Sequence, residues 1–273
     1  MGRNKNFNKM IKAFTLNEIL HPVCDFMNRS TLIKGVSFVI GMYMLSITAL
    51  SAQVSVTATA GTVGPTSYTT LKGAFDAINA GTHQGVVAIS LSGNTTETAS
   101  AVLNSGVVAP AAYTSVSVKA TVPVTVSGSI VGAVIKLNGA DNVTIDGRIA
   151  GSGRNITVQN TSTSAATAAV WLSSVAVGNG CVNNTIRNLE LLTGIDPTAS
   201  SNSTFGIIMC GASISTTSNG IDNDNNSFIA NRVMKARYGI VTRGTTTDLN
   251  LGIIVTDNII GPSAFGTNCH LRI

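Results

Sequence analysis

The stretch NTIRNLEL at residues 184–191 decides the expected fold, because its pattern recurs twice further along the chain. The two later copies are NSFIANRV at 226–233 and IVTDNII at 254–260. Each copy contains a short apolar strand, then an asparagine, then a second apolar segment; the asparagines are Asn188, Asn231 and Asn258. Repeats of a few short strands at intervals of tens of residues are typical of solenoid proteins.

A second class of apolar strand lies between these copies and alternates strictly with them. Its members are AVWL at 169–172, FGIIM at 205–209 and YGIVT at 238–242. In a solenoid, each turn of chain pairs with the turns above and below it at about 4.8 Å, and the inward Val, Ile and Leu side chains stack into one core. The alternation therefore predicts an all-β protein built as a parallel β-helix.

The recurrent asparagine is expected at a tight bend, because asparagine tolerates left-handed backbone geometry. Its side-chain amide could also bond the equivalent amide in the next turn of the stack. A role for these asparagines as sugar ligands is the less favoured alternative.

The first half of the mature chain shows the same kind of strand. Short Val- and Ile-rich runs, all but one of which end in Gly or Asn, lie at residues 86–93, 115–120, 124–132, 133–139, 142–147 and 155–160. These are strand signals with turn residues between them. No helical segment separates the strands, which excludes a doubly wound α/β fold.

One helix is expected, near residues 67–80. Leu71, Ala74, Phe75 and Ile78 are spaced to form one apolar helix face. Ser67, Thr69 or Thr70 can cap its start, and Gly81 follows its end. We expect this helix to cover the open end of the solenoid, where strand edges and core would otherwise be exposed.

Composition supports stacked strands with polar turns. Hydrophobic residues make up 44% of the 273-residue chain, whereas only 11% are charged and 5% aromatic. The net charge is +5, but residues 1–52 contain six basic and two acidic residues and account for most of it. The remaining chain has no basic stripe, so no nucleic-acid partner is expected.

Residues 1–52 are expected to be a signal peptide with an extended basic region. The apolar run 36–52 follows Arg29 and Lys34 and ends in small residues, which indicates cleavage after Ala52. Met27 is an alternative start. A membrane anchor is the alternative to cleavage, but the run is at the short limit for spanning. The expected location is therefore secreted or on the outer cell surface, with no stable membrane span after cleavage.

Four segments carry a family resemblance: residues 68–81, 86–98, 141–147 (DNVTIDG) and 182–191 (VNNTIRNLEL). They resemble pectate-lyase-like right-handed parallel β-helix proteins, and more narrowly the large bacterial surface proteins that carry C-terminal sorting domains. The resemblance implies a leading strand and capping helix over 53–85 and a β-helix over 86–262. It also implies that residues 263–273 are an irregular tail and that the chain is an N-terminal fragment.

The resemblance does not extend to the catalytic motifs of this group. Polygalacturonase-like members have an Asp pair, a Gly-His-Gly and an Arg-Ile-Lys, and none of these occurs here. Lyase-like members bind calcium through acids next to an Arg or Lys. Asp222 and Asp224 are the candidate calcium ligands, with Arg187 or Arg232 nearby. A polar turn is the favoured alternative, and no other cofactor is expected.

Other residues that could bear function have structural alternatives. Trp171 and Tyr238 are candidates for stacking on a glycan, whereas Phe205 and Phe228 are expected in the core. Asp141 and Asp146 are expected to mark the two ends of one strand and not to form a catalytic pair. The odd cysteine count in the mature chain favours unpaired thiols, although stacking could bring Cys181 and Cys210 together.

Two functions remain open from the sequence. The favoured one is a non-enzymatic secreted or cell-surface module, adhesin-like or structural, with possible glycan contact. Its expected partner is a polysaccharide or another cell-surface ligand. The alternative is a carbohydrate-active β-helix, a polysaccharide lyase or glycoside hydrolase, whose site is incomplete in this chain.

Overall fold

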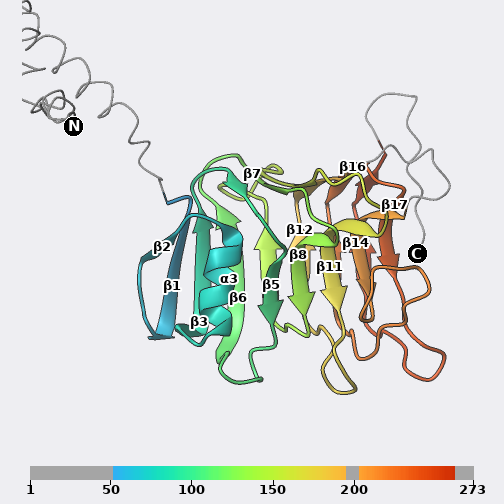
Figure 1. Ribbon diagram of the computed structural model, residues 1–273, viewed down its shortest axis with the longest axis horizontal. Helices are drawn as coiled ribbons and strands as arrows, with labels where there is room; N and C mark the ends of the chain where they lie inside the picture. Colours follow the sequence, from blue (N-terminus) through green and yellow to red (C-terminus); the bar gives the residue numbers. More distant parts are fainter. Residues whose placement is uncertain (1–51, 195–202, 262–273) are drawn as a thin grey trace, which may run out of the picture. The chain divides into compact units, whose positions relative to one another are not determined.

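The computed structural model describes residues 52–194 and 203–261, and the regular secondary structure of these residues is almost entirely β-strand (Figure 1). Within these ranges the strands form three sheets and a single helix packs beside them.

Sheet A contains, from one edge to the other, β18 (Ile254–Thr256), β15 (Ser227–Ile229), β12 (Thr185–Arg187), β9 (Val143–Asp146), β6 (Tyr113–Ala120), β3 (His83–Leu91), β1 (Val54–Gly61) and β2 (Thr66–Tyr68). Sheet B contains β19 (Ile259–Ile260), β16 (Arg232–Lys235), β13 (Leu189–Leu192), β10 (Ile156–Asn160), β7 (Val124–Gly128) and β4 (Thr95–Thr96). Sheet C contains β17 (Tyr238–Thr242), β14 (Thr204–Cys210), β11 (Thr167–Ser173), β8 (Ala133–Asn138) and β5 (Ala101–Asn104).

From β3 onward the chain visits the three sheets in strict rotation, A then B then C. We call one such set of successive strands a pass. Every strand from β3 to β19 pairs in parallel with its equivalents in the neighbouring passes, whereas β1 pairs antiparallel with β2 and β3. Such an arrangement is compatible with a solenoid.

The two strand classes expected from the sequence correspond to this rotation. The NTIRNLEL segment contains β12 of sheet A followed by β13 of sheet B, and its two later copies contain β15 with β16 and β18 with β19. The second class consists of β11, β14 and β17, all in sheet C. The alternation along the sequence is therefore confirmed as an alternation between sheets.

The expected equivalence of the three bend asparagines is wrong by one residue. Asn188 has left-handed backbone, with φ 54°, and its structural equivalent in the next pass is Ala230, with φ 53°. Asn231 lies one position later, where its Oδ1 accepts a hydrogen bond from the Leu189 amide at 3.1 Å. The expected amide ladder does form, but between Asn231 and Asn258, whose Nδ2 and Oδ1 are 3.1 Å apart.

A second amide ladder lies where sheet C leads into sheet A, and the sequence did not reveal it. Asn184 and Asn226 are both fully buried, and the Asn184 Nδ2 donates to the Asn226 Oδ1 at 3.0 Å. The Asn184 Oδ1 accepts from the Val143 amide at 2.9 Å, and the Asn226 Nδ2 donates to the Cys181 carbonyl at 2.7 Å. These amides therefore join three successive passes through the interior.

Helix α3 (Leu71–Asn79) buries the face that the sequence predicts. Thr70 is its N-cap, and the Thr70 Oγ1 accepts a hydrogen bond from the Gly73 amide at 3.0 Å. The helix is shorter than the expected 67–80 because residues 66–68 pair with β1 as β2. Its buried face joins the main core, and the helix packs against β5, β1 and β3 (Figure 1).

Glu97 attaches the start of α3 to the sheets. Its carboxylate accepts hydrogen bonds from the Leu71 amide at 3.0 Å and the Lys72 amide at 2.9 Å, and the residue is 2% exposed. These amides belong to the first turn of the helix, which has no intrahelical acceptors for them. A negative charge there also interacts favourably with the helix dipole.

We expect Glu97→Ala to lower the free energy of unfolding by about 2–3 kcal/mol, because two helix amides lose their acceptor in a buried position. Glu97→Gln should cost less, since one side-chain oxygen remains. Urea denaturation measures both. Lys72→Ala, which removes only an exposed pair with Asp76, is the control. A Glu97→Ala effect no larger than that of the control would contradict the helix-anchoring role.

The main core lies between the three sheets. It receives inward side chains from each of them, for example Val143 in sheet A, Val158 in sheet B and Leu172 in sheet C. A second apolar cluster lies on the opposite face of sheet C, because β11 and β14 are buried along both faces. Both faces of β11 and β14 are thus largely apolar, whereas the outward side chains of β6, β9 and β12 in sheet A are polar.

Candidate functional site: a cationic depression beside β9

A charged row crosses the outer face of sheet A. Val143 and Ile145 of β9 point into the core, so Asp146 projects outward at the end of the strand. In the neighbouring strands, Lys119 of β6 and Arg187 of β12 are both in register with Asp146. Adjacent strands lie about 4.8 Å apart, so parallel pairing places these three side chains in one line.

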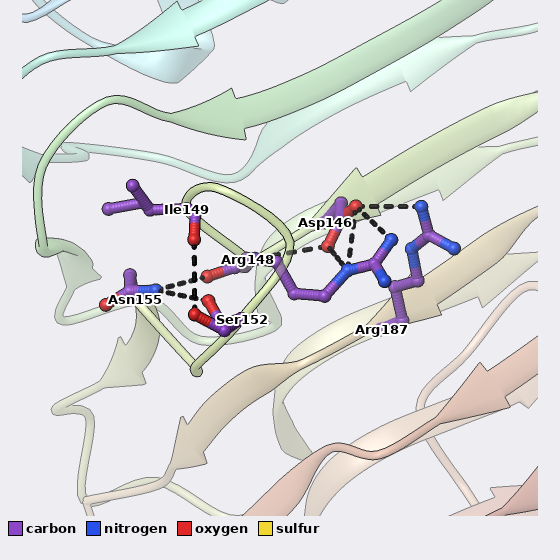
Figure 2. A network of polar contacts seen from close by, with 7 residues as sticks. Asp146, Arg148, Ile149, Ser152, Asn155 and Arg187 are labelled. Atoms are coloured by element: carbon purple, nitrogen blue, oxygen red, sulfur yellow. Dashed lines mark hydrogen bonds and ion pairs between the residues drawn. The ribbon is translucent and has the colours of Figure 1, made fainter.

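The carboxylate of Asp146 is held by two guanidinium groups (Figure 2). The Arg148 Nε lies 3.0 Å from Oδ1 and its Nη2 lies 3.0 Å from Oδ2. The Arg187 Nη2 lies 2.8 Å from Oδ2, and the Arg148 backbone amide donates to Oδ1 at 3.1 Å. The Asp146 side chain is only 4% exposed, whereas both arginine side chains are 32% exposed.

A tight loop between β9 and β10 fixes the position of Arg148. Ile149 and Ser152 exchange backbone hydrogen bonds of 3.0 and 3.1 Å across the loop (Figure 2). The Asn155 Nδ2 donates to the carbonyls of Gly147 and Ser152, each at 3.1 Å. Arg148 is thus presented by a loop that is closed on itself and anchored to the strand.

This environment keeps Asp146 ionised. Burial by itself raises the pKa of the carboxyl group, but the hydrogen bonds from Arg148 and Arg187 outweigh it, and the pKa is lowered. The same pairing raises the pKa of the Arg148 guanidinium. A carboxylate that is ionised and already accepts hydrogen bonds from four N–H groups is suited neither to donate a proton nor to abstract one.

The side chains border a depression of about 340 Å³ on the protein surface. Its polar lining consists of three cations, Lys119, Arg148 and Arg187, around the single carboxylate of Asp146. The Arg187 Nε is buried and has no hydrogen-bond partner. The three cations outnumber the single carboxylate, so the depression carries a net positive charge.

The candidate calcium ligands Asp222 and Asp224 lie in the turn before β15. Each accepts a hydrogen bond from a backbone amide, one in the preceding pass and the other in the following pass. The Asp222 Oδ2 accepts from the Gly178 amide at 2.5 Å, whereas the Asp224 Oδ1 accepts from the Leu251 amide at 2.6 Å. The described ranges contain no group of three His, Cys, Asp or Glu residues that could hold a metal ion. Calcium binding here stays a prediction.

The arginines that the sequence placed beside this turn have other partners. Arg187 binds Asp146 in sheet A, and the Arg232 Nη1 lies 3.6 Å from the Glu190 Oε1 in sheet B. The pairing of Arg187 with Asp146 spans 41 residues and depends on strand register, so no local pattern in the sequence could have revealed it.

The candidate glycan-stacking residues belong to the second apolar cluster, on the outer face of sheet C. Trp171 is 9% exposed, and the Lys136 Nζ lies 4.0 Å from its ring centre. Tyr238 stacks on Phe205, with ring centres 5.1 Å apart. Protein groups thus already cover part of both rings, and glycan stacking stays a prediction. Phe228 is fully buried in the main core, as expected, whereas Phe205 is fully buried in the second cluster, on the opposite face of sheet C.

The two ends of β9 have opposite electrostatic character. Asp141 precedes the strand and accepts from the Val182 amide at 2.8 Å, while burial raises its pKa. It borders a separate depression of about 270 Å³ with Tyr113. Asp141 and Asp146 therefore flank β9, as the sequence predicts, and their side chains face different surroundings.

Both described cysteines are free, buried thiols. Burial raises the pKa of Cys181 to about 12 and that of Cys210 to about 11. Both thiols are thus neutral at physiological pH, and a neutral thiol is a poor nucleophile and metal ligand.

The expected signal peptide, apart from Ala52, and the whole expected tail, residues 263–273, lie outside the described residues. Within the described ranges, no helix is long and apolar enough to span a membrane. Comparison of the chain with protein-family models, curated proteins and solved structures yields no match.

Proposed function

We propose that the chain is a right-handed parallel β-helix module of a secreted or cell-surface protein, and that it binds a glycan without cleaving it. The strict rotation of strands through three sheets supports the fold. The basic and apolar segments before Ala52 support export. The resemblance of the strand and bend motifs to pectate-lyase-like proteins supports both.

The observation that favours binding over catalysis is that the carboxylates already have hydrogen-bond or ion-pair partners within the protein. Six acidic side chains accept hydrogen bonds from backbone amides, mostly in turns that belong to another pass: Glu97, Asp141, Asp146, Asp222, Asp224 and Asp248. Two further acids, Asp76 and Glu190, form ion pairs. Glycoside hydrolysis needs two carboxyl groups that converge on one bond and exchange protons. Here four of these acids, Asp141, Asp222, Asp224 and Asp248, bind amides in the turns of a neighbouring pass, and the others bind the start of α3 or a basic side chain.

The outer face of sheet A offers a surface for glycan contact. Ser117, Thr144, Thr185 and Ser227 occupy one register position on four successive strands. All four are partly exposed, so their hydroxyl groups form a row with a spacing of about 4.8 Å. Hydroxyl groups both donate and accept hydrogen bonds, as sugar hydroxyls do.

The test measures binding and turnover together. The full chain is incubated with a panel of acidic and neutral polysaccharides, with and without calcium. We expect at least one polymer to bind, with no new reducing ends and no unsaturated products. Cleavage that is lost on Asp224→Ala, but kept in Asp76→Asn, would overturn the proposal in favour of a calcium-dependent lyase.

A further inference from the structure

The cationic depression retains binding capacity after its internal bonds are counted. Arg148 uses its Nε and Nη2 on Asp146, which leaves its Nη1. Arg187 uses its Nη2, which leaves its Nη1 at the partly exposed end of the side chain. Lys119 is exposed and forms no ion pair within the described part of the chain. Three cations thus offer N–H donors to a single surface depression.

The geometry of these donors distinguishes between kinds of anion. A planar carboxylate is recognised best by the Nε and Nη edge of one guanidinium, which donates two parallel hydrogen bonds. That edge is occupied by Asp146 in Arg148. In Arg187 the Nε of the same edge is buried. The remaining donors come from three separate segments, β6, the loop after β9 and β12, so neither arginine offers a free Nε and Nη edge to a carboxylate.

We propose that this depression binds a tetrahedral oxyanion, a sulfate or phosphate ester carried on a polymer, through Lys119, Arg148 and Arg187. The inference rests on the proposed binding function and adds the class of ligand. Oxygens arranged tetrahedrally can accept from three directions at once, whereas a carboxylate presents two oxygens in one plane. Asp146 acts as a positioning residue, because it orients both guanidinium groups without taking up all of their donors.

The test compares polymers of one backbone that differ only in the charged group. The full chain is titrated with dextran sulfate, phosphorylated dextran, carboxymethyl dextran of matched charge density, and unmodified dextran. We expect the sulfated or phosphorylated polymer to bind at least about tenfold more tightly than the carboxylated one, the difference that one charge-assisted hydrogen bond supplies. Preference for sulfate or for phosphate identifies which ester is the ligand.

Lys119→Gln removes one cation without disturbing the Asp146 network, since Lys119 has no bond to it. It should weaken binding of the preferred polymer about tenfold. Lys72→Gln, which removes an exposed charge on α3, should leave the affinity unchanged. Equal losses in the two variants, tighter binding of the carboxylated polymer, or no binding of either ester would each overturn the inference.

Cleavage of the polymers would refute the proposed function and leave the oxyanion inference to be judged by the affinities. Product formation is therefore followed in the same titrations. Binding without cleavage, but with equal affinity for all charged polymers, would refute the oxyanion site and leave the binding function intact.

Discussion

Asp146→Ala is expected to lower the free energy of unfolding by about 3 kcal/mol at neutral pH, because removing one partner of a buried ion pair leaves the other charge uncompensated. Arg148 and Arg187 would both lose their acceptor at distances of 2.8–3.0 Å. The value lies at the low end of the range for buried pairs because each guanidinium is about a third exposed. Asp146→Asn should be milder, since its remaining oxygen can still accept hydrogen bonds.

The loss should depend on pH, and the sign follows from the lowered pKa of Asp146. A group whose pKa is lower in the folded protein than in the unfolded chain stabilises the fold above its unfolded pKa, about 3.9 for aspartate. That stabilisation disappears as the pH falls through the folded pKa. The difference between the protein and Asp146→Asn should thus be largest near pH 7 and should shrink below about pH 4.

Asp141→Asn is the matched control, because the same change is made at the other end of β9. Burial raises the pKa of Asp141, so its charged form disfavours folding as the pH rises through the folded pKa. Asparagine at this position should be neutral or slightly stabilising at pH 7. Urea unfolding from pH 3 to 7 measures both variants. Parallel pH profiles for the two would contradict the electrostatic roles assigned to these carboxyl groups.

Asn184→Ala is expected to cost about 4 kcal/mol, because two buried groups lose their partner at once and each costs about 1–3 kcal/mol. These groups are the Val143 amide and the Ala140 carbonyl, whereas the Asn226 Oδ1 loses one hydrogen bond but keeps that from the Asn184 backbone amide. All lie in the interior that joins successive passes, where water cannot replace the lost hydrogen bonds.

Asn94→Ala provides the control, since Asn94 also accepts a backbone amide from the next pass, that of Thr125 at 2.8 Å, but is exposed. Asn94→Ala should lower the free energy of unfolding by less than about 1 kcal/mol, because water can accept the hydrogen bond of the Thr125 amide instead. Denaturation gives both values, and hydrogen exchange at the Val143 amide should accelerate only in Asn184→Ala. Similar losses in the two variants would show that burial of the ladder is not what matters.

The larger strands could be predicted because their signals are local. The runs that became β6, β8, β9 and β10 each alternate or cluster Val and Ile between turn residues. The helix face was predicted for the same reason, since four apolar residues at helical spacing need no distant partner. The two-residue strand β4 was not predicted, because Thr95 and Thr96 carry no apolar pattern and pair only through β7.

The candidate site could not be predicted, because it depends on register between distant segments. Arg187 meets Asp146 only because β12 pairs with β9 in one register, and a shift by one residue would place these side chains on opposite faces. The bend asparagines show the same limit. Asn188 and Asn231 look equivalent in sequence, yet they occupy neighbouring positions in the stack.

The sequence by itself determined the succession of elements: one capped helix, then short apolar strands of two alternating classes. This information is local, since it resides in side-chain periodicity and in turn residues. Only the tertiary structure decided which polar groups meet. It joined Glu97 to the start of α3, Asn184 to Asn226, and Asp146 to two arginines. The physical reason is that buried amides and charges require partners, and parallel pairing brings those partners from the neighbouring pass.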